Sequence, residues 1–268
     1  MASTILQTIA DHAKIRVKEA KKEVSLQEMK ERAQKIRDKE KADPAHVDFA
    51  FEKALARPEI GFICECKKAS PSKGLIAPEF PYLEIAKSYE AAGAACISVL
   101  TEPKWFLGEN RFLKEITGTV SIPCIRKDFT VDEYMIYEAK TLGASAVLLI
   151  CSLLDTQTLK CYREICDSLG LSALVEAHDE EEIQSALEAG ARIIGVNNRN
   201  LKDFTVDIHN SERLRALVPS EVLFVAESGI KTAADIQVLK DANVNGVLIG
   251  ETLMRSPDKK AMLDELRG

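Results

Sequence analysis

The sequence lacks long apolar runs, since no stretch approaches the about 18 apolar residues that a membrane-spanning helix needs. Its first residues, "MASTILQTIADHAKIRVKEAKK", reach an acidic residue by position 11 without an apolar core, which excludes a secretory signal peptide. The seven cysteines are odd in number and scattered through apolar segments, which is typical of a reducing compartment. We therefore expect a cytoplasmic protein without a membrane partner.

An excess of positive charge is also missing. The net charge of −6 and the isoelectric point near 5.5 argue against a nucleic-acid partner, because duplex binders are normally basic. No Cys, His and Asp cluster has the spacing of metal ligands, and His178 and His209 have no further candidate ligands nearby. No Gly-rich dinucleotide turn follows an early strand either. We expect neither a metal nor a cofactor.

What the sequence does contain is a repeat. From residue 61 onward, a helical run ends in a small residue and a glycine, and a short aliphatic strand follows, as in "YMIYEAKTLGASAVLLI". Glycines 93, 143, 170 and 190, and Asn243 in the last unit, stand where a helix favours a left-handed residue after its end. The repeat therefore predicts alternating helices and buried strands.

Eight strands are predicted in this way, at spacings of 20 to 33 residues. They begin near Phe62, Ala95, Ile122, Ser145, Ser172, Arg192, Val222 and Asn245. Continuous apolar strands that alternate with amphipathic helices indicate a parallel sheet covered on both faces. Eight units in about 200 residues favour a (β/α)₈ barrel, the TIM barrel, over an open doubly wound sheet.

Residues 1–60 stand outside the repeat. The segments "LQTIADHAKIRVKEAKKEV" and "SLQEMKERAQKIRDK" are predicted helices, the second with Ser25 as its N-cap and Glu28 three residues on. The segment "KADPAHVD" then breaks the helical pattern. We expect an N-terminal helical extension, residues 1–60, packed on a barrel domain, residues 61–268. The segment alone leaves open whether the extension covers an active site.

Charged residues at the ends of apolar strands point to a site. In "GFICECKKASPSKGLI", Ile63, Glu65 and Lys67 share one strand face, and Cys64 and Cys66 share the other. Active sites of parallel barrels lie at the carboxyl ends of the strands, so Glu65 and Lys67 are predicted to line the barrel mouth while the cysteines pack against helices. The same parity adds further polar residues from later strand ends: Lys127, Glu176, Asn197, Arg199, Glu227 and Ser228.

Two glycine-containing turns suggest the substrate class. Gly229 in "ESGI" and Gly250 in "IGET" follow the last two strands, where barrels commonly bind phosphate through backbone N–H groups and a helix N-terminus. Glu251 follows Gly250, so we assign the contact to the Gly250 backbone alone. The predicted ligand is a small phosphorylated molecule. A structural ion-pair network at the mouth remains the alternative explanation for the charges.

These blocks resemble one known family. "ECKKASPSKG" is similar to the first-strand signature of indole-3-glycerol phosphate synthases, and "VLTEPKWFLG", "IRKDFTVDEYMIYEAKTLGASAVLLI", "LVEAH", "VAESGI" and "VLIGETLMR" resemble later blocks in the same order. The resemblance implies a cofactor-free carboxy-lyase that cyclises, decarboxylates and dehydrates 1-(2-carboxyphenylamino)-1-deoxyribulose 5-phosphate. We expect a monomer that is not fused to an isomerase domain.

The resemblance also implies roles. Lys127 is the expected general acid, Glu176 the group that assists proton removal, and Lys67 the holder of the substrate carboxylate. Glu65 is expected to orient Lys67, and Asn197 to contact the departing hydroxyl. The other implied contacts are substrate positioning by Arg199, Glu227 and Ser228, phosphate binding by Ser70, Gly229 and Gly250, and walls for the aromatic ring from Trp105, Phe106 and Phe129, unless those rings only pack their loops.

Two rival functions remain open at this point. Another phosphosugar barrel, such as a phosphoribosylanthranilate isomerase, needs one acid and one base for an enol shift, for which Cys and Asp at strand ends would serve. Here Lys67, Lys127 and Glu176 end strands instead, which favours ring closure. A non-catalytic barrel that senses a phosphorylated ligand is the rival from another class. We also predict that the "SPSKG" loop closes on substrate.

Overall fold

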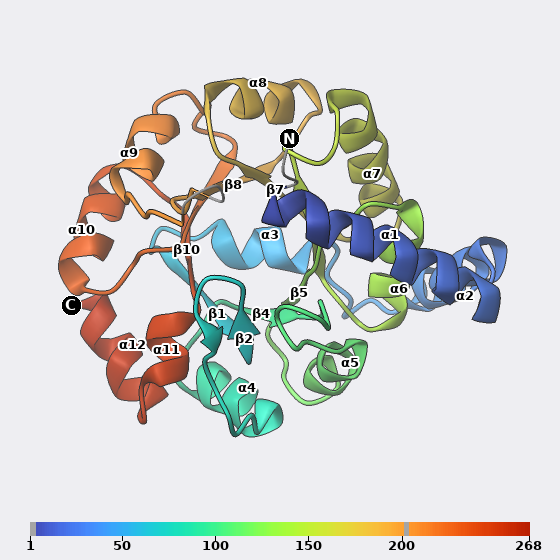
Figure 1. The fold of residues 1–268 in the computed structure, drawn as a ribbon, viewed down its shortest axis with the longest axis horizontal. Helices are drawn as coiled ribbons and strands as arrows, with labels where there is room; N and C mark the ends of the chain where they lie inside the picture. Colours follow the sequence, from blue (N-terminus) through green and yellow to red (C-terminus); the bar gives the residue numbers. More distant parts are fainter. Residues whose placement is uncertain (1–3, 201–203) are drawn as a thin grey trace.

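The computed structural model describes residues 4–200 and 204–268, so the first three residues of the predicted extension and residues 201–203 lie outside it. In the described part, eight parallel strands close into a barrel in the order β1-β10-β9-β8-β7-β6-β5-β4 (Figure 1). They are β1 (Gly61–Cys66), β4 (Cys96–Leu100), β5 (Cys124–Lys127), β6 (Ala146–Ile150), β7 (Ser172–Ala177), β8 (Ile193–Asn197), β9 (Leu223–Glu227) and β10 (Gly246–Ile249). The predicted TIM barrel is confirmed, and each predicted strand starts within two residues of its observed start.

Helices alternate with these strands and surround the barrel (Figure 1). They are α4 (Tyr82–Ala91), α5 (Asn110–Thr117), α6 (Glu133–Thr141), α7 (Thr156–Ser168), α8 (Glu180–Glu188), α9 (His209–Arg215), α10 (Ala233–Asp241), α11 (Glu251–Arg255) and α12 (Lys259–Arg267). The predicted left-handed residues after helices are confirmed, with φ between 69° and 82° at the four glycines and 58° at Asn243. These turns let each helix reverse directly into the next strand.

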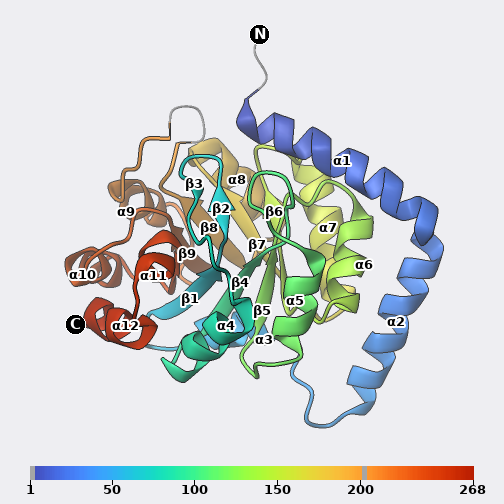
Figure 2. The same cartoon turned by 60° about the horizontal axis from the view of Figure 1, so that its bottom comes forward.

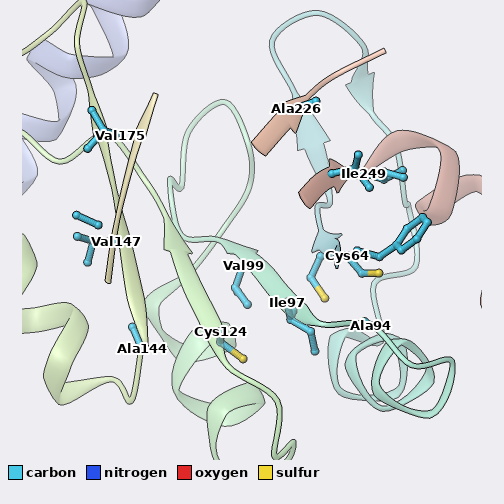
Figure 3. Close-up of a cluster of buried hydrophobic side chains, with 14 of the residues drawn as sticks. Cys64, Ala94, Ile97, Val99, Cys124, Ala144, Val147, Val175, Ala226 and Ile249 are labelled. Carbon is cyan, nitrogen blue, oxygen red and sulfur yellow. The ribbon is translucent and has the colours of Figure 1, made fainter. Parts of the chain in front are cut away.

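Two apolar layers flank the barrel wall. Cys64 and Cys66 are 0% and 1% exposed in the outer layer, between strands and helices, as strand parity predicts (Figure 3 shows part of this layer around Cys64 and Ile97). Ile63, on the opposite face of β1, belongs to the inner layer. The neighbouring residues of one strand therefore divide between the two layers.

A short helix that the sequence pattern did not predict, α3 (Ala50–Leu55), closes one end of the barrel, where Phe51 and Leu55 join the inner apolar layer. It begins after Phe49 in a left-handed conformation and has no side-chain N-cap, so it carries no sequence signal for a helix start. The strands' amino ends are thereby sealed, and the site must lie at their carboxyl ends.

The two predicted N-terminal helices are present as α1 (Ile5–Glu23) and α2 (Leu26–Ala42). The Ser25 hydroxyl accepts the Glu28 N–H at 3.2 Å, which confirms the predicted cap, while the Glu28 carboxylate binds Arg32. Helix α1 crosses the barrel mouth and α2 runs down the side of the barrel (Figure 2). Among the described residues, no helix is long and apolar enough to span a membrane.

Candidate active site

A cavity of about 340 Å³ opens at the carboxyl ends of the barrel strands, which is large enough for a small phosphorylated molecule. All but one of the side chains and glycines predicted for the site line this one cavity, and the exception is Trp105. The set comprises Glu65, Lys67, Ser70, Phe106, Lys127, Phe129, Glu176, Asn197, Arg199, Glu227, Ser228, Gly229 and Gly250. In the part of the chain that the structure describes, no group of three or more His, Cys, Asp or Glu side chains is arranged to hold a metal.

Lys127 lies at the centre of the charged groups. Its Nζ is 3.0 Å from Glu176 Oε2 and 2.7 Å from Glu227 Oε2. Burial acts to lower the pKa of Lys127, but the attraction of Glu176, Glu227 and Glu65 outweighs burial and raises that pKa. Lys127 is therefore a charged proton donor throughout the neutral range.

The two carboxylates that bind Lys127 differ in their proton affinity. Burial and the neighbouring Glu176 charge raise the pKa of Glu227 to about 7, although Lys127 acts against them. Burial also acts to raise the pKa of Glu176, but Lys127 and His178 outweigh it and lower that pKa. Glu227 Oε1 is buried and has no hydrogen-bond partner among the described residues. Glu176 is thus the ionised member and Glu227 the one that holds a proton most readily.

A second ion pair lies at the end of β1. Lys67 Nζ is 2.6 Å from Glu65 Oε1, and the Ser98 hydroxyl donates to Glu65 Oε2 at 3.3 Å. A Cβ at Gly250 would lie 2.3 Å from Glu65 Oε1 and 2.8 Å from Lys67 Nζ. Glycine at 250 therefore leaves the space that this pair occupies.

The predicted phosphate-binding residues gather on one side of the cavity. Ser228 and Gly229 are consecutive left-handed residues, with φ of 69° and 86°, and Gly250 precedes α11 as its N-cap. Ser70 ends β2 (Ala69–Ser70), which pairs with β3 (Gly74–Leu75) in a hairpin that contains the "SPSKG" loop. The Glu251 carboxylate binds Arg255 at 3.1 Å, which ties it to its own helix.

The aromatic residues after β4 and β5 separate into two groups. Phe106 and Phe129 line the cavity with ring centroids 6.0 Å apart. Trp105 is not among the described lining residues, and its ring packs edge-on against His12 of α1 at 5.3 Å. The buried Glu102 carboxylate accepts the N–H groups of both Trp105 and Phe106, which fixes the loop so that the two rings diverge. Of the two roles left open for Trp105, the structure therefore favours packing against α1 over lining the cavity.

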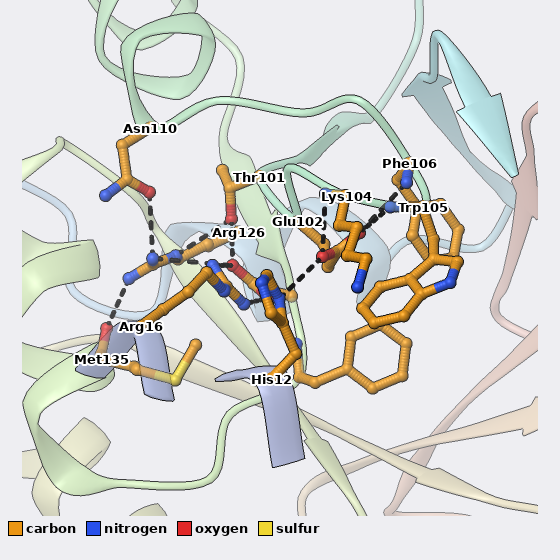
Figure 4. A network of polar contacts seen from close by, with 12 residues as sticks. His12, Arg16, Thr101, Glu102, Lys104, Trp105, Phe106, Asn110, Arg126 and Met135 are labelled. Atoms are coloured by element: carbon orange, nitrogen blue, oxygen red, sulfur yellow. Dashed lines mark hydrogen bonds and ion pairs between the residues drawn. The ribbon is translucent and has the colours of Figure 1, made fainter. Parts of the chain in front are cut away.

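Helix α1 supplies a lining that sequence analysis missed, through Ile5, Leu6 and Ile9. Arg16, further along α1, binds the fully buried Asp128 carboxylate at 2.7 Å, and Thr101 donates to the same carboxylate (Figure 4). Asp128 directly follows Lys127 in the sequence. The extension therefore covers the barrel mouth. The amphipathic pattern of α1 predicts that one face of the helix is buried, but it does not predict which part of the barrel that face packs against.

The family model described as indole-3-glycerol phosphate synthase matches residues 6–266 of this chain. The chain belongs to the indole-3-glycerol phosphate synthase family. An indole-3-glycerol phosphate synthase of Ruminiclostridium cellulolyticum is 61% identical over 98% of this chain and 99% of the relative. One from Lachnoclostridium phytofermentans is 50% identical over 98% of both chains. The family consists of carboxy-lyases of tryptophan biosynthesis, so this chain is an enzyme of that class.

Solved structures with low sequence identity show the fold alone. Thiamine phosphate pyrophosphorylase from Pyrococcus furiosus aligns with a TM-score of 0.59 at 17% identity, covering 81% of this chain and 95% of that one. KGPDC from Streptococcus mutans aligns with a TM-score of 0.60 at 11% identity, covering 78% and 95%. The synthase family shares its barrel with proteins of unlike sequence, so residue roles must come from the site itself.

Proposed function

We propose that the cavity converts 1-(2-carboxyphenylamino)-1-deoxyribulose 5-phosphate to indole-3-glycerol phosphate, CO₂ and water. The observation that carries this proposal is the position of Lys127 between two carboxylates, facing the same cavity as the Lys67–Glu65 pair. Two ammonium groups and a separate ionised carboxylate supply the two proton donors and one acceptor that ring closure followed by dehydration requires. We propose that this protein acts in the cytoplasm as a monomer.

Ring closure assigns the first role to Lys127. When the aryl carbon attacks the ketone, negative charge develops on the ketone oxygen, and a buried ammonium stabilises it and donates a proton. The raised pKa of Lys127 keeps this donor charged, and a developing alkoxide is a stronger base than an amine, so the transfer proceeds downhill. Loss of CO₂ then restores aromaticity in the ring, which we place against the cavity wall that Phe106 and Phe129 form.

Dehydration assigns the remaining roles. Glu176, ionised at neutral pH, removes the carbon-bound proton, and Lys67 holds the carboxylate and later protonates the departing hydroxyl. Asn197 donates to Glu176 Oε1 at 3.5 Å, which suits a residue that contacts that hydroxyl beside the base. We assign Arg199, Glu227 and Ser228 to substrate positioning, and Ser70 with the Gly229 and Gly250 backbones to the phosphate.

The test mixes the purified protein with the carboxyphenylamino-deoxyribulose phosphate and follows indole fluorescence. We expect product with the unaltered protein and a loss of about 10²-fold to 10⁴-fold in kcat for Lys127→Ala. Lys104→Ala is the matched control, because Lys104 lies on the same face of the barrel but packs on Trp105 and is not among the described cavity-lining residues.

Three other outcomes would change the assignment. Equal turnover by the unaltered protein and Lys127→Ala would make Lys67 the leading acid. Substrate binding without product in either protein would indicate a ligand sensor or a different phosphosugar reaction. An equal loss in Lys104→Ala would show that the assay responds to general perturbation of the barrel face rather than to proton donation.

A further inference from the structure

His178 lies just beyond β7, two residues after Glu176, and it is not among the described residues that line the cavity. Its Nε2 is 3.5 Å from Glu176 Oε1, and its Nδ1 is 3.0 Å from Glu182 Oε2. The imidazole therefore stands between two carboxylates. One of these faces the cavity and the other belongs to the first turn of α8.

Glu182 holds the ring in one orientation. Its Oε2 also accepts the backbone N–H of His178 at 2.8 Å, and its own N–H is bound by Asp179, the N-cap of α8, at 2.9 Å. The helix start, the strand end and the ring are thus joined by one carboxylate. Because a carboxylate cannot donate, Nδ1 must carry the proton toward Glu182.

This orientation sets a condition on the other side of the ring. With a proton on Nδ1, the neutral ring presents a lone pair at Nε2, and the facing Glu176 Oε1 presents another. Nε2 is buried and has no hydrogen-bond partner among the described residues. A proton must lie on one of these two atoms for their approach to be attractive: either Glu176 is a carboxylic acid, or His178 is an imidazolium.

Because Glu176 acts as a base and is therefore ionised, we propose that His178 is a positioning residue whose charged ring points its Nε2–H at Glu176 Oε1 and keeps that carboxylate ionised and oriented, and that Glu182 stabilises the charged ring. The inference rests on the proposed role of Glu176 as the group that removes the substrate proton. When Glu176 removes the substrate proton, the substrate C–H bond breaks and a Glu176 O–H bond forms, while His178 keeps its own Nε2 proton. Glu176 then loses that proton to water, and both groups return to their starting forms.

The surroundings of His178 favour the charged ring. Burial acts to lower the pKa of His178, but the Glu182 hydrogen bond and the charges of Glu176, Glu182 and Glu227 outweigh it and raise that pKa. The Ser152 hydroxyl after β6 lies 3.3 Å from His178 Nδ1, and the Asn210 amide on α9 donates to the His178 carbonyl. The Cys151 thiol and the Asn197 amide bind the two acidic neighbours instead, at the Glu182 carbonyl and the Glu176 carboxylate.

The first experiment needs no substrate. In protein labelled with ¹⁵N-histidine, the His178 signals are assigned by their loss in His178→Gln, and their pKa is measured by NMR in Glu176→Gln and Glu182→Gln. We expect the His178 pKa to fall by about one unit in each variant, because each removes a charge within about 4 Å of the ring. His209 is the matched control, since its Nδ1 lies 3.0 Å from Glu212 Oε2 on an exposed face of α9. An unchanged His178 pKa in Glu176→Gln overturns the proposal.

The second experiment measures turnover. We expect His178→Gln to lower kcat about tenfold or more, with KM changed less than about twofold, and to remove one ionisation from the pH profile of kcat. His209→Gln keeps the original profile. A His178→Gln enzyme with unaltered kcat and pH profile overturns the proposal. If no protein forms product, the proposed function fails, and the NMR coupling between Glu176 and His178 still decides this inference. If His178→Gln does not fold, Glu182→Gln decides the kinetics.

Discussion

Lys127 and Glu227 form a 2.7 Å ion pair although their strands lie on opposite sides of the barrel. In the closed order of eight strands, β5 and β9 are separated by β6, β7 and β8 on one side and by β4, β1 and β10 on the other. The two side chains therefore meet across the mouth, over the inner apolar layer. Their distance is set by the closure of the whole barrel rather than by any local hydrogen-bonded ladder.

Glu227→Gln will change how stability depends on pH. The pKa of Glu227 in the folded protein, about 7, exceeds its ordinary value of 4.5 because the carboxyl is buried. The unfolded chain therefore loses this proton first, and the free energy of unfolding falls as the pH rises between those values. Relative to the unaltered protein, Glu227→Gln should gain up to about 3 kcal/mol between pH 5 and pH 8 in urea unfolding. Glu221→Gln, at an exposed position just before β9, should show no such trend, and a parallel pH dependence in all three proteins would contradict the prediction.

Gly250→Ala will impair the site more than the fold. The added methyl would lie 2.3 Å from Glu65 Oε1, so the Lys67–Glu65 pair must move. We expect kcat/KM to fall about tenfold or more because the displaced ammonium no longer meets the substrate carboxylate. In the control Gly118→Ala, the nearest contact of the new methyl is an ordinary 3.5 Å, to the Lys114 carbonyl oxygen. Equal kinetics for both variants would remove the steric role of Gly250.

Arg16→Ala will destabilise the attachment of α1. Burial acts to raise the pKa of Asp128, but Arg16 and Arg126 outweigh it and lower that pKa. Without Arg16 the buried carboxylate loses its main partner, at a cost of about 3 kcal/mol in the free energy of unfolding at neutral pH. The loss should shrink as the pH falls and Asp128 becomes protonated. Lys14→Ala removes an exposed ion pair on the same helix and should leave stability nearly unchanged. A pH-independent loss in Arg16→Ala would point to lost packing instead.

The "SPSKG" loop will become protected when substrate binds. Lys73 and Gly74 are exposed beside the cavity, where the chain turns from β2 into β3, and Gly74 adopts a left-handed φ of 62° that favours glycine at a hinge. Hydrogen exchange on the Lys127→Ala protein, which should hold substrate without turning it over, should slow across residues 69–75. The turn at residues 117–121, between α5 and β5 and away from the cavity, serves as the reference. Equal exchange at 69–75 with and without substrate would exclude closure.

Most of the barrel, and the charged residues at its mouth, could be predicted from local sequence patterns. Alternation along β1 placed Glu65 and Lys67 inward and Cys64 outward, because successive side chains of a strand point to opposite faces. The glycine and Asn243 positions marked the helix ends, since left-handed residues there need a small or amide side chain. A resemblance to known blocks then supplied the roles that these positions alone do not carry.

Features that depend on where one segment lies against another were not readable from those patterns. Helix α3 has no cap signal, and it is held by burial of Phe51 and Leu55 inside the barrel. Trp105 and Phe106 are adjacent aromatic residues, yet the hydrogen bonds of Glu102 turn one toward α1 and the other into the cavity. The sequence alone does not predict that two adjacent aromatic side chains point in different directions, because that depends on the conformation of the loop.

The order of helices and strands, the inward parity of Glu65, Lys67 and Lys127, and the left-handed turns all follow from the chain, because each depends on residues within a few positions. Tertiary structure decided three other features: the covering of the mouth by α1, the Lys127–Glu227 pair across the barrel, and the position of His178 between two carboxylates. The first two join residues far apart in sequence, and the third depends on how the chain turns from β7 into α8. Their proton affinities depend on burial and neighbouring charge, which exist only once the barrel has closed.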